Sequence, residues 1–424
     1  MRALDVAPDG SVRASLAEVD PFDSGDPHAA GLISAIAARH GVPLGSVLVG
    51  SSVGSLVAVI ARALLAPEVR VAVAEPCAEE LTREILAQGA RYVDVGRDAR
   101  FVLREDSLAR ALEDGVSAVC LDQPSWPTGV AAPMDALRIS LASGAWLVVD
   151  ESEAGLGAPS ALELLAEEGL DTSRLVIVRS LGTLTGLGAL EVAYVIGSQA
   201  LVTRARLLRP RSGLGALAQA AGLATLQGPV RHAEALTERR SALRAALCQG
   251  SNVEVPESTS AHLFVRVPGV SGVALAQALD EAGIAVTTMG HPSWRDGVAL
   301  AVAPDCDAPR VGAGILAVLA SMALVFGAAC SNQEAPSPAS VAPTPTAEVT
   351  TKPSEADKKG TPPALRKRLF EEPLVGGCGR SCTTARQAFE GFAATLAATD
   401  AVQRLPRYLD TSVLVLDGRP EGPR

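Results

Sequence analysis

Short apolar runs alternate with segments of helical periodicity from about residue 27 to residue 302. The segment GLISAIAARHG has apolar residues at helical spacing and ends at Gly41, a residue typical of helix ends. The runs VRVAVAEP, ARYVDV, VSAVCLDQP, GAWLVVDE and SRLVIVRS are typical of strands, and helical patterns separate most of them. Apolar strands that alternate with helices predict a mostly parallel sheet covered on both faces. In such sheets ligands bind at the carboxyl ends of the strands.

The same pattern divides the chain into several parts. Helical segments dominate after Leu201, and a strand, a helix and two strand-like runs then predict a small α+β domain. A large α/β domain followed by a small domain implies a cleft between them. The composition changes near residue 330 to a Pro/Ser/Thr/Ala-rich linker that we expect to be disordered, before a short tail with helical segments. The predicted boundaries are 1–26 for an N-terminal arm, 27–200 for the large domain, 201–322 for the small domain, 331–364 for the linker and 365–424 for the tail.

Residues 311–330 form an uncharged, mostly apolar run that admits two interpretations. In the first, residues 308–322 are the last helix of the small domain. In the second, the run is a membrane span or a lipoprotein-like signal that ends at Cys330, because its length suffices to cross a bilayer. The second interpretation would make the chain a fused reading frame with an envelope-anchored tail. The chain would then associate with a membrane through this run alone.

Charge and cysteine content exclude some functions. A net charge of −10 argues against nucleic acid as a partner, because binding phosphates needs a basic face. Four cysteines lie in apolar or mixed surroundings without the spacing of metal ligands, which predicts reduced thiols and no metal site. They are Cys77, Cys120, Cys248 and Cys306. Since the first ten residues also lack an apolar export segment, we expect residues 1–322 in the cytoplasm.

Four motifs lie at or beside the predicted strand ends. They are GSSVGSL at 50–56, QPSWPTG at 123–129, DESE at 150–153 and SLGTLTGLGALE at 180–191. Their order and spacing resemble the class I and II aminotransferases of fold type I, which depend on pyridoxal phosphate, and in particular the histidinol-phosphate aminotransferase group. The resemblance covers roughly residues 27–322. It implies a large domain of the pyridoxal-phosphate transferase type, a small α+β domain, and a dimer.

The resemblance also implies a lysine that forms a Schiff base with the cofactor and carries a proton during catalysis. Thr183 stands at that position, and the first lysine of the chain is Lys352. Other groups that the family uses are replaced as well. The phosphate-binding arginine is replaced by Glu191, the asparagine at the ring oxygen by Trp126 and the tyrosine of the DEAY motif by Glu153. The stacking aromatic is replaced by Leu81 and, in a looser alignment, the substrate-binding arginine is replaced by Ala299.

Two features of the motif set are retained. Asp150 stands where the family pairs a carboxylate with the cofactor's ring nitrogen, and the small-residue turn with Val53 and Gly54 can offer backbone N–H groups to an anion. We therefore expect a pseudoenzyme without a catalytic lysine, whose ancestral cofactor, pyridoxal phosphate, is no longer bound. It would bind a small molecule or protein in the old cleft, as a homodimer or as the inactive partner of a related subunit. The alternatives are a protein that binds pyridoxal phosphate non-covalently and performs reduced chemistry through Asp150, and the fused reading frame.

Overall fold

The structure is a computed structural model of the whole chain. It describes residues 10–20, 22–182, 187, 190–209, 214–227, 233–250, 252–290, 294–303 and 306–330, with side chains only as far as 321 in the last segment. All of these residues belong to one compact unit, which spans Met1–Ala335. Thr183, the predicted linker and the predicted tail lie outside the described residues.

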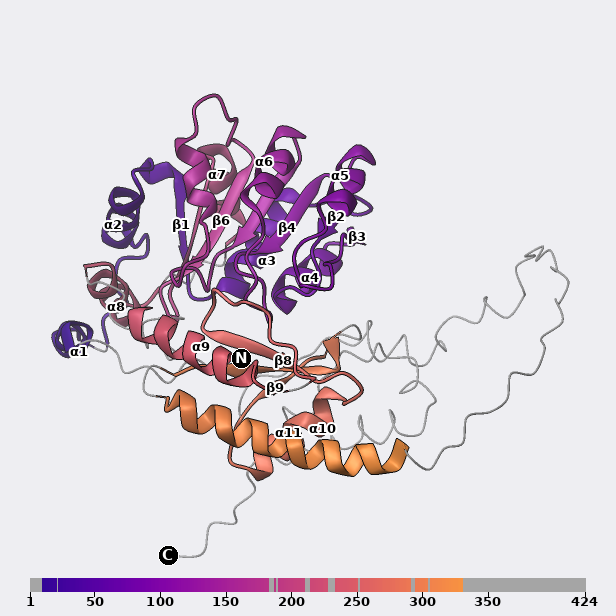
Figure 1. Cartoon of the computed structure of the whole chain (residues 1–424). Helices are drawn as coiled ribbons and strands as arrows, with labels where there is room; N and C mark the ends of the chain where they lie inside the picture. Colours follow the sequence, from indigo (N-terminus) through magenta and orange to yellow (C-terminus); the bar gives the residue numbers. More distant parts are fainter. Residues whose placement is uncertain are drawn as a thin grey trace, which may run out of the picture. The chain divides into compact units, whose positions relative to one another are not determined.

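A seven-stranded sheet forms the centre of the large domain (Figure 1). Its strands in chain order are β1 (Val47–Gly50), β2 (Arg70–Val73), β3 (Arg91–Asp94), β4 (Ala118–Asp122), β5 (Trp146–Asp150), β6 (Leu175–Ser180) and β7 (Ala193–Gly197). They are arranged in the order β1-β7-β6-β5-β4-β2-β3, and only β7 runs antiparallel to its neighbours. The prediction of a mostly parallel α/β sheet is therefore confirmed.

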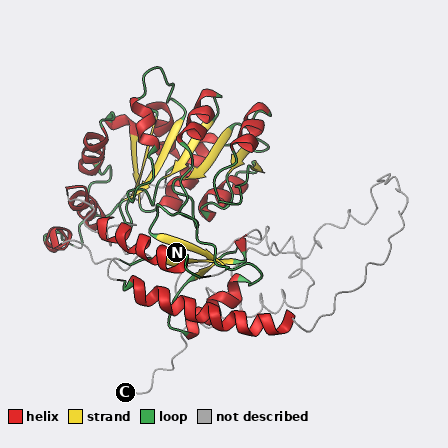
Figure 2. Ribbon diagram, in the orientation of Figure 1, coloured by secondary structure: helices red, strands yellow, loops and turns green. Residues whose placement is uncertain are grey.

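Helices cover both faces of this sheet, and each face has its own hydrophobic core (Figure 2). Alternate strand residues point to opposite faces, so Val119 and Leu121 of β4 belong to one core and Cys120 to the other. On the first face the helices are α2 (Ala30–His40), α5 (Glu105–Glu113) and α6 (Met134–Ala142); on the second they are α3 (Val53–Leu64), α4 (Glu79–Ala87) and α7 (Gln199–Leu208). Burial on both faces explains why the inner strands β4, β5 and β6 are mostly apolar runs, whereas the edge strand β3 has no buried residue.

The small domain is built on a three-stranded antiparallel sheet in the order β8-β10-β9. Its elements are β8 (His262–Arg266), α10 (Gly272–Glu281), β9 (Thr287–Thr288), β10 (Gly297–Ala301) and α11 (Ala308–Cys330). Before it come α8 (Ala216–Gln227) and α9 (Ala233–Leu247), and in the N-terminal arm α1 (Gly10–Ala17) packs against α8. Leu263 and Val265 of β8 face a core that α9, α10 and α11 close.

The apolar run at 311–330 lies within α11. Ile315 and Leu319 of this helix pack against Leu243 and Leu247 of α9, so its first part belongs to the core of the small domain. No helix in the described part of the chain is both long enough and apolar enough to span a membrane. This packing supports the interpretation of 308–322 as the last helix of the domain. The side chain of Cys330, the predicted acylation site, lies outside the described residues.

Candidate functional site

Two buried carboxylates end neighbouring strands at the carboxyl edge of the large sheet. Asp122 is the last residue of β4 and Asp150 the last of β5, and the two are paired in the register of these strands. Their exposed fractions are 4% and 2%. The parallel arrangement brings both side chains to the edge where α/β sheets bind ligands. The structure therefore places Asp150 where the motif indicated and adds Asp122 beside it.

The environment of Asp150 raises the pKa of its carboxyl group from 3.8 to about 6. Burial is the main cause because it penalises the charged form, and the nearby carboxylates of Glu80 and Glu153 act in the same direction. Hydrogen bonds from Ser152 oppose the rise, and its backbone N–H donates to Oδ1 of Asp150 at 2.8 Å. A cationic N–H donor placed here would favour the ionised carboxylate.

Asp122 holds together the loops that follow β2 and β4. Its Oδ2 accepts the backbone N–H of Ala78 at 3.0 Å and that of Trp126 at 2.6 Å, while Oδ1 lies 3.4 Å from Nη2 of Arg97. Burial raises the pKa of Asp122 to about 8, although Arg97 opposes the rise. Arg97 is itself buried and donates through Nη2 to the carbonyl of Ala74, whereas its Nε and Nη1 have no partner among the described residues. Sequence reasoning missed this pair, although Asp122 ends an apolar run as Asp150 does.

Trp126, Glu153 and His262 meet where the large domain contacts the small one. Oε2 of Glu153 lies 3.2 Å from Nδ1 of His262, which is the first residue of β8. The rings of Trp126 and His262 are 4.6 Å apart between centroids and nearly perpendicular, at 86°. Both the glutamate and the histidine are buried, and Trp126 is half-buried. The two large-domain positions at which the family's asparagine and tyrosine are replaced thus share one small-domain neighbour.

The turn between β1 and α3 prepares the start of a helix. The side chain of Ser52 accepts the backbone N–H of Ser55 at 3.1 Å, and the side chain of Ser55 accepts the backbone N–H of Ser52 at 3.2 Å. Val53 and Gly54 are the first two residues of α3, where a helix offers no acceptor of its own for the backbone N–H groups. A Cβ atom on Gly54 would make an ordinary contact with Cγ of Glu80, 3.4 Å away on α4. These two N–H groups can bind an anion.

Leu81, Glu191 and Ala299, three positions at which the family's groups are replaced, do not join this cluster. Leu81 is 2% exposed and packs in the core between α3, α4 and the sheet. Glu191 is exposed, and Ala299 is buried in β10. The prediction that Leu81 marks a position on the cofactor's ring face finds no support in this arrangement, because α4 turns the side chain inward together with Ile85, one helical turn later.

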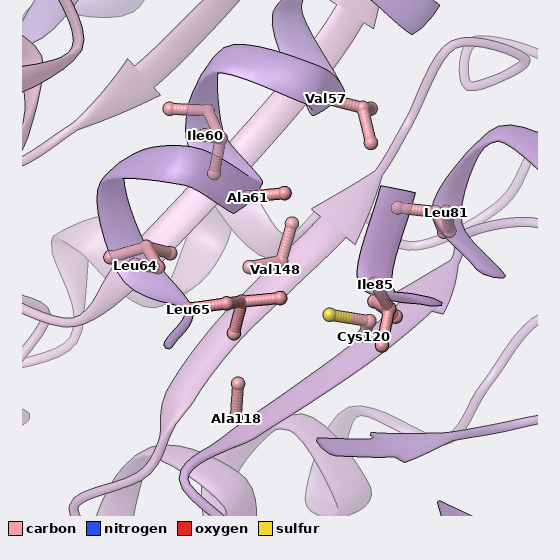
Figure 3. A pocket seen from close by; sticks show the side chains of 10 residues that line it. All are labelled: Val57, Ile60, Ala61, Leu64, Leu65, Leu81, Ile85, Ala118, Cys120 and Val148. Carbon is pink, nitrogen blue, oxygen red and sulfur yellow. The ribbon is translucent and has the colours of Figure 1, made fainter. Parts of the chain in front are cut away.

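Leu81 lines a small apolar cavity in that core (Figure 3). The cavity has a volume of about 20 Å³, and no polar surface lines it. Its lining offers a water molecule no polar partner. The lining residues are Val57, Ile60, Ala61, Leu64, Leu65, Leu81, Ile85, Ala118, Cys120 and Val148. This cavity is a packing defect and is distinct from the site at the strand ends.

Comparison with known proteins establishes the family. The model of the aminotransferase class I and II family matches residues 14–306. The chain belongs to this family. It is 29% identical over 318 residues to histidinol-phosphate aminotransferase 2 of Rhizobium meliloti, covering 73% of this chain and 88% of the relative. It is 25% identical over 287 residues to histidinol-phosphate aminotransferase 1 of Bacillus cereus, covering 65% and 76%.

Solved structures share the fold. A histidinol-phosphate aminotransferase from Sinorhizobium meliloti in complex with pyridoxal 5'-phosphate matches with a TM-score of 0.66 and 18% identity, covering 76% of this chain and 89% of the other. A mutant aspartate aminotransferase from Thermus thermophilus matches with a TM-score of 0.65 and 18% identity, covering 76% and 94%. The expectation that no cofactor belongs to this chain is therefore wrong. Its relatives are aminotransferases, and one matching structure is a complex with pyridoxal phosphate.

Proposed function

We propose that this chain binds pyridoxal phosphate at the carboxyl edge of its large sheet without a covalent link, as a pseudoenzyme that does not complete transamination. One observation carries the proposal: a member of the family has no lysine before Lys352. Thr183, at the position that matches the family's lysine, has no amine. A hydroxyl group can neither form the covalent link nor accept a proton as an amine does.

The described residues fit the cofactor in part. Asp150 would pair with the N–H of the protonated ring, which would hold the carboxylate ionised although its burial favours the neutral form. The backbone N–H groups of Val53 and Gly54 would donate to the phosphate at the start of α3. The bound cofactor supplies an electron-withdrawing ring and an aldehyde. Glu191 would repel the phosphate that the family's arginine attracts, so we expect weaker binding than in active relatives.

The chain's own groups set the limit on activity. Asp150 would keep the ring of the bound cofactor protonated, and Asp122 holds the loops that follow β2 and β4 through the N–H groups of Ala78 and Trp126. Neither group supplies a base at the position of the missing lysine. Losing a covalent catalyst that also moves protons removes several powers of ten in rate, since each ~1.4 kcal/mol of barrier is a factor of ten. We expect no transamination at the rate of active family members.

Cofactor retention by the full-length protein tests this proposal. The purified chain is incubated with pyridoxal phosphate, passed through a gel-filtration column, and examined for visible absorbance at the protein peak. The cofactor should co-elute with the wild type and be retained less by Asp150→Asn. After borohydride reduction and proteolysis, no lysine-linked cofactor can come from residues 1–351, whereas a Thr183→Lys variant should yield a labelled peptide containing that residue. Absence of bound cofactor would overturn the binding part, and transamination at an ordinary rate would overturn the pseudoenzyme part.

The assembly and location of the protein are further proposals. We propose a homodimer, or a pair with a related subunit, that works in the cytoplasm. In the described part of the chain Cys77 and Cys120 are free buried thiols, as expected in a reducing compartment. Sedimentation of the purified chain tests the dimer, and fractionation of cells tests the location.

A further inference from the structure

The contact between Glu153 and His262 leaves one buried acceptor unused. Oε2 of Glu153 lies 3.2 Å from Nδ1 of His262, while Oε1 has no hydrogen-bond partner among the described residues and is shielded from solvent. The whole glutamate is 7% exposed. A buried carboxylate oxygen without a donor destabilises the fold, because it has lost its hydrogen bonds to water without replacing them. Such an oxygen marks a position that a donor from outside the chain can fill.

The charge around this oxygen favours a cation. Glu80 and Glu153 lie close enough to Asp150 to raise its pKa, and Asp150 in turn raises that of Asp122. Of the groups that contact Glu153, His262 is the one described side chain that can carry a positive charge. A cation placed at Oε1 would satisfy the acceptor and lower the repulsion among the carboxylates.

Trp126 supplies an aromatic surface at the same place. Its ring lies against His262, which also contacts Glu153, and the tryptophan is only half-buried. Tryptophan is the aromatic side chain that attracts cations most strongly. A carboxylate and a tryptophan that both contact the same histidine offer an organic ammonium group a hydrogen-bond acceptor and an aromatic face. Where the family's motifs have asparagine and tyrosine, this chain therefore has two groups that suit a cation.

We propose that the junction of Trp126, Glu153 and His262 binds the ammonium group of an aliphatic amine. The amine donates an N–H to Oε1 of Glu153 and lies beside the indole ring. Since Oε1 is enclosed, the ligand enters when β8, which carries His262, moves away from the end of β5, and the site closes after it. This inference goes beyond the proposed function, because the site needs no cofactor.

Calorimetric titration of the full-length protein without pyridoxal phosphate tests the site. The probes are 1,4-diaminobutane and the dicarboxylate succinate, which has the same chain length and opposite charge. The diamine should bind and succinate should not. Glu153→Gln keeps the shape and removes the charge, so it should weaken diamine binding about tenfold or more, in line with a charge-assisted hydrogen bond. Glu113→Gln, an exposed change on α5, is the matched control and should leave the affinity unchanged.

A second pair of variants separates recognition from folding. Trp126→Phe retains an aromatic face and should weaken diamine binding less than Trp126→Leu, while thermal melting checks that each variant is folded. Equal affinity of wild type and Glu153→Gln for the diamine would overturn the proposal, as would equal affinity of the wild type for diamine and succinate. The titration needs no cofactor, so its failure leaves cofactor binding standing. Conversely, failure to retain pyridoxal phosphate leaves the amine site standing.

Discussion

Replacing Asp150 by asparagine should stabilise the cofactor-free protein, but only where the wild-type carboxyl group is ionised. The side chain is 2% exposed, and burial raises its pKa from 3.8 to about 6. The folded protein therefore holds this proton more tightly than the unfolded chain does. As the pH rises from about 4 to 6 the unfolded chain loses the proton first, and the contribution of Asp150 to the free energy of unfolding of the wild type falls. Asparagine carries no charge, so the variant escapes this loss.

The size of the effect follows from the two pKa values. The gap between 3.8 and about 6, at ~1.4 kcal/mol for each pH unit, gives about 3 kcal/mol above pH 7. At about pH 4 most of this difference disappears because the carboxyl group is protonated in the folded protein and about half protonated in the unfolded chain. The asparagine Oδ1 can still accept the backbone N–H of Ser152, which donates to Oδ1 of Asp150 at 2.8 Å in the wild type. Asp122, whose pKa is also raised, is present in both proteins and largely cancels in the comparison.

Urea unfolding at about pH 4 and pH 8, followed by tryptophan fluorescence, measures the difference. Trp126, Trp146 and Trp294 all lie in the described part of the fold and report on it. Asp280→Asn removes an exposed carboxylate on α10 and should change the free energy of unfolding by less than about 0.5 kcal/mol at either pH. If Asp150→Asn is no more stable than the wild type at pH 8, or gains equally at both pH values, the carboxyl group does not titrate as argued.

Three further changes test the fold around the site. Leu81→Ala should lower the free energy of unfolding by about 2–5 kcal/mol in urea, because it enlarges an existing apolar cavity; a loss under ~1 kcal/mol would contradict the packing. Glu151→Ala should cost about 3–5 kcal/mol by leaving the largely buried Arg179 unpaired, and a second change of Arg179 to Met should recover part of the loss. Burial, together with Arg179 and Arg39, lowers the pKa of His40 to about 4, so the contribution of His40 to stability should fall as the pH drops below about 6.5; His40→Gln should remove this contribution, measured as the difference in melting temperature between variant and wild type against pH.

The sequence predicted the sheet because its strands are buried on both faces. All five residues of β4 are buried, so its run AVCLD is apolar up to the final aspartate. The direction of β7 could not be predicted in this way. Its residues are as apolar as those of the parallel strands, and its antiparallel orientation depends on pairing with β1 and β6. An apolar run indicates that a strand is buried, but it does not indicate which way the strand points.

The sequence predicted a site residue only where a single motif contains everything that identifies it. Asp150 follows an apolar strand within a motif, so its place was evident. The partner of Glu153 was not, because His262 lies 109 residues further along the chain, in the other domain. Arg97 and Asp122 are 25 residues apart and meet only when β3 and β4 are arranged around β2. The alignment of Leu81 with the family's stacking aromatic stays a prediction, since a motif alignment does not say which face of α4 a residue occupies.

The carboxylates at the strand ends argue for a ligand on energetic grounds. Asp122, Asp150 and Glu153 are all buried, and burial raises the pKa of the first two to about 8 and about 6. Burying such groups destabilises a fold unless partners offset the cost. Glu151, which has a full set of partners in Arg179, Ser160 and Ala161, needs nothing more, whereas Oε1 of Glu153 has none among the described residues.

A protein that kept this fold for its structure alone would be more stable with neutral residues at Asp150 and Glu153. Stability that is given up at buried titratable groups is typical of binding and catalytic sites. The two positions also require different partners: a ring N–H at Asp150 and an ammonium group at Glu153. Asp150→Asn should therefore gain stability in the absence of ligand. Asp150→Asn and Glu153→Gln should each lose binding of their respective ligands. Both results would show that the protein gives up stability at these positions in order to bind.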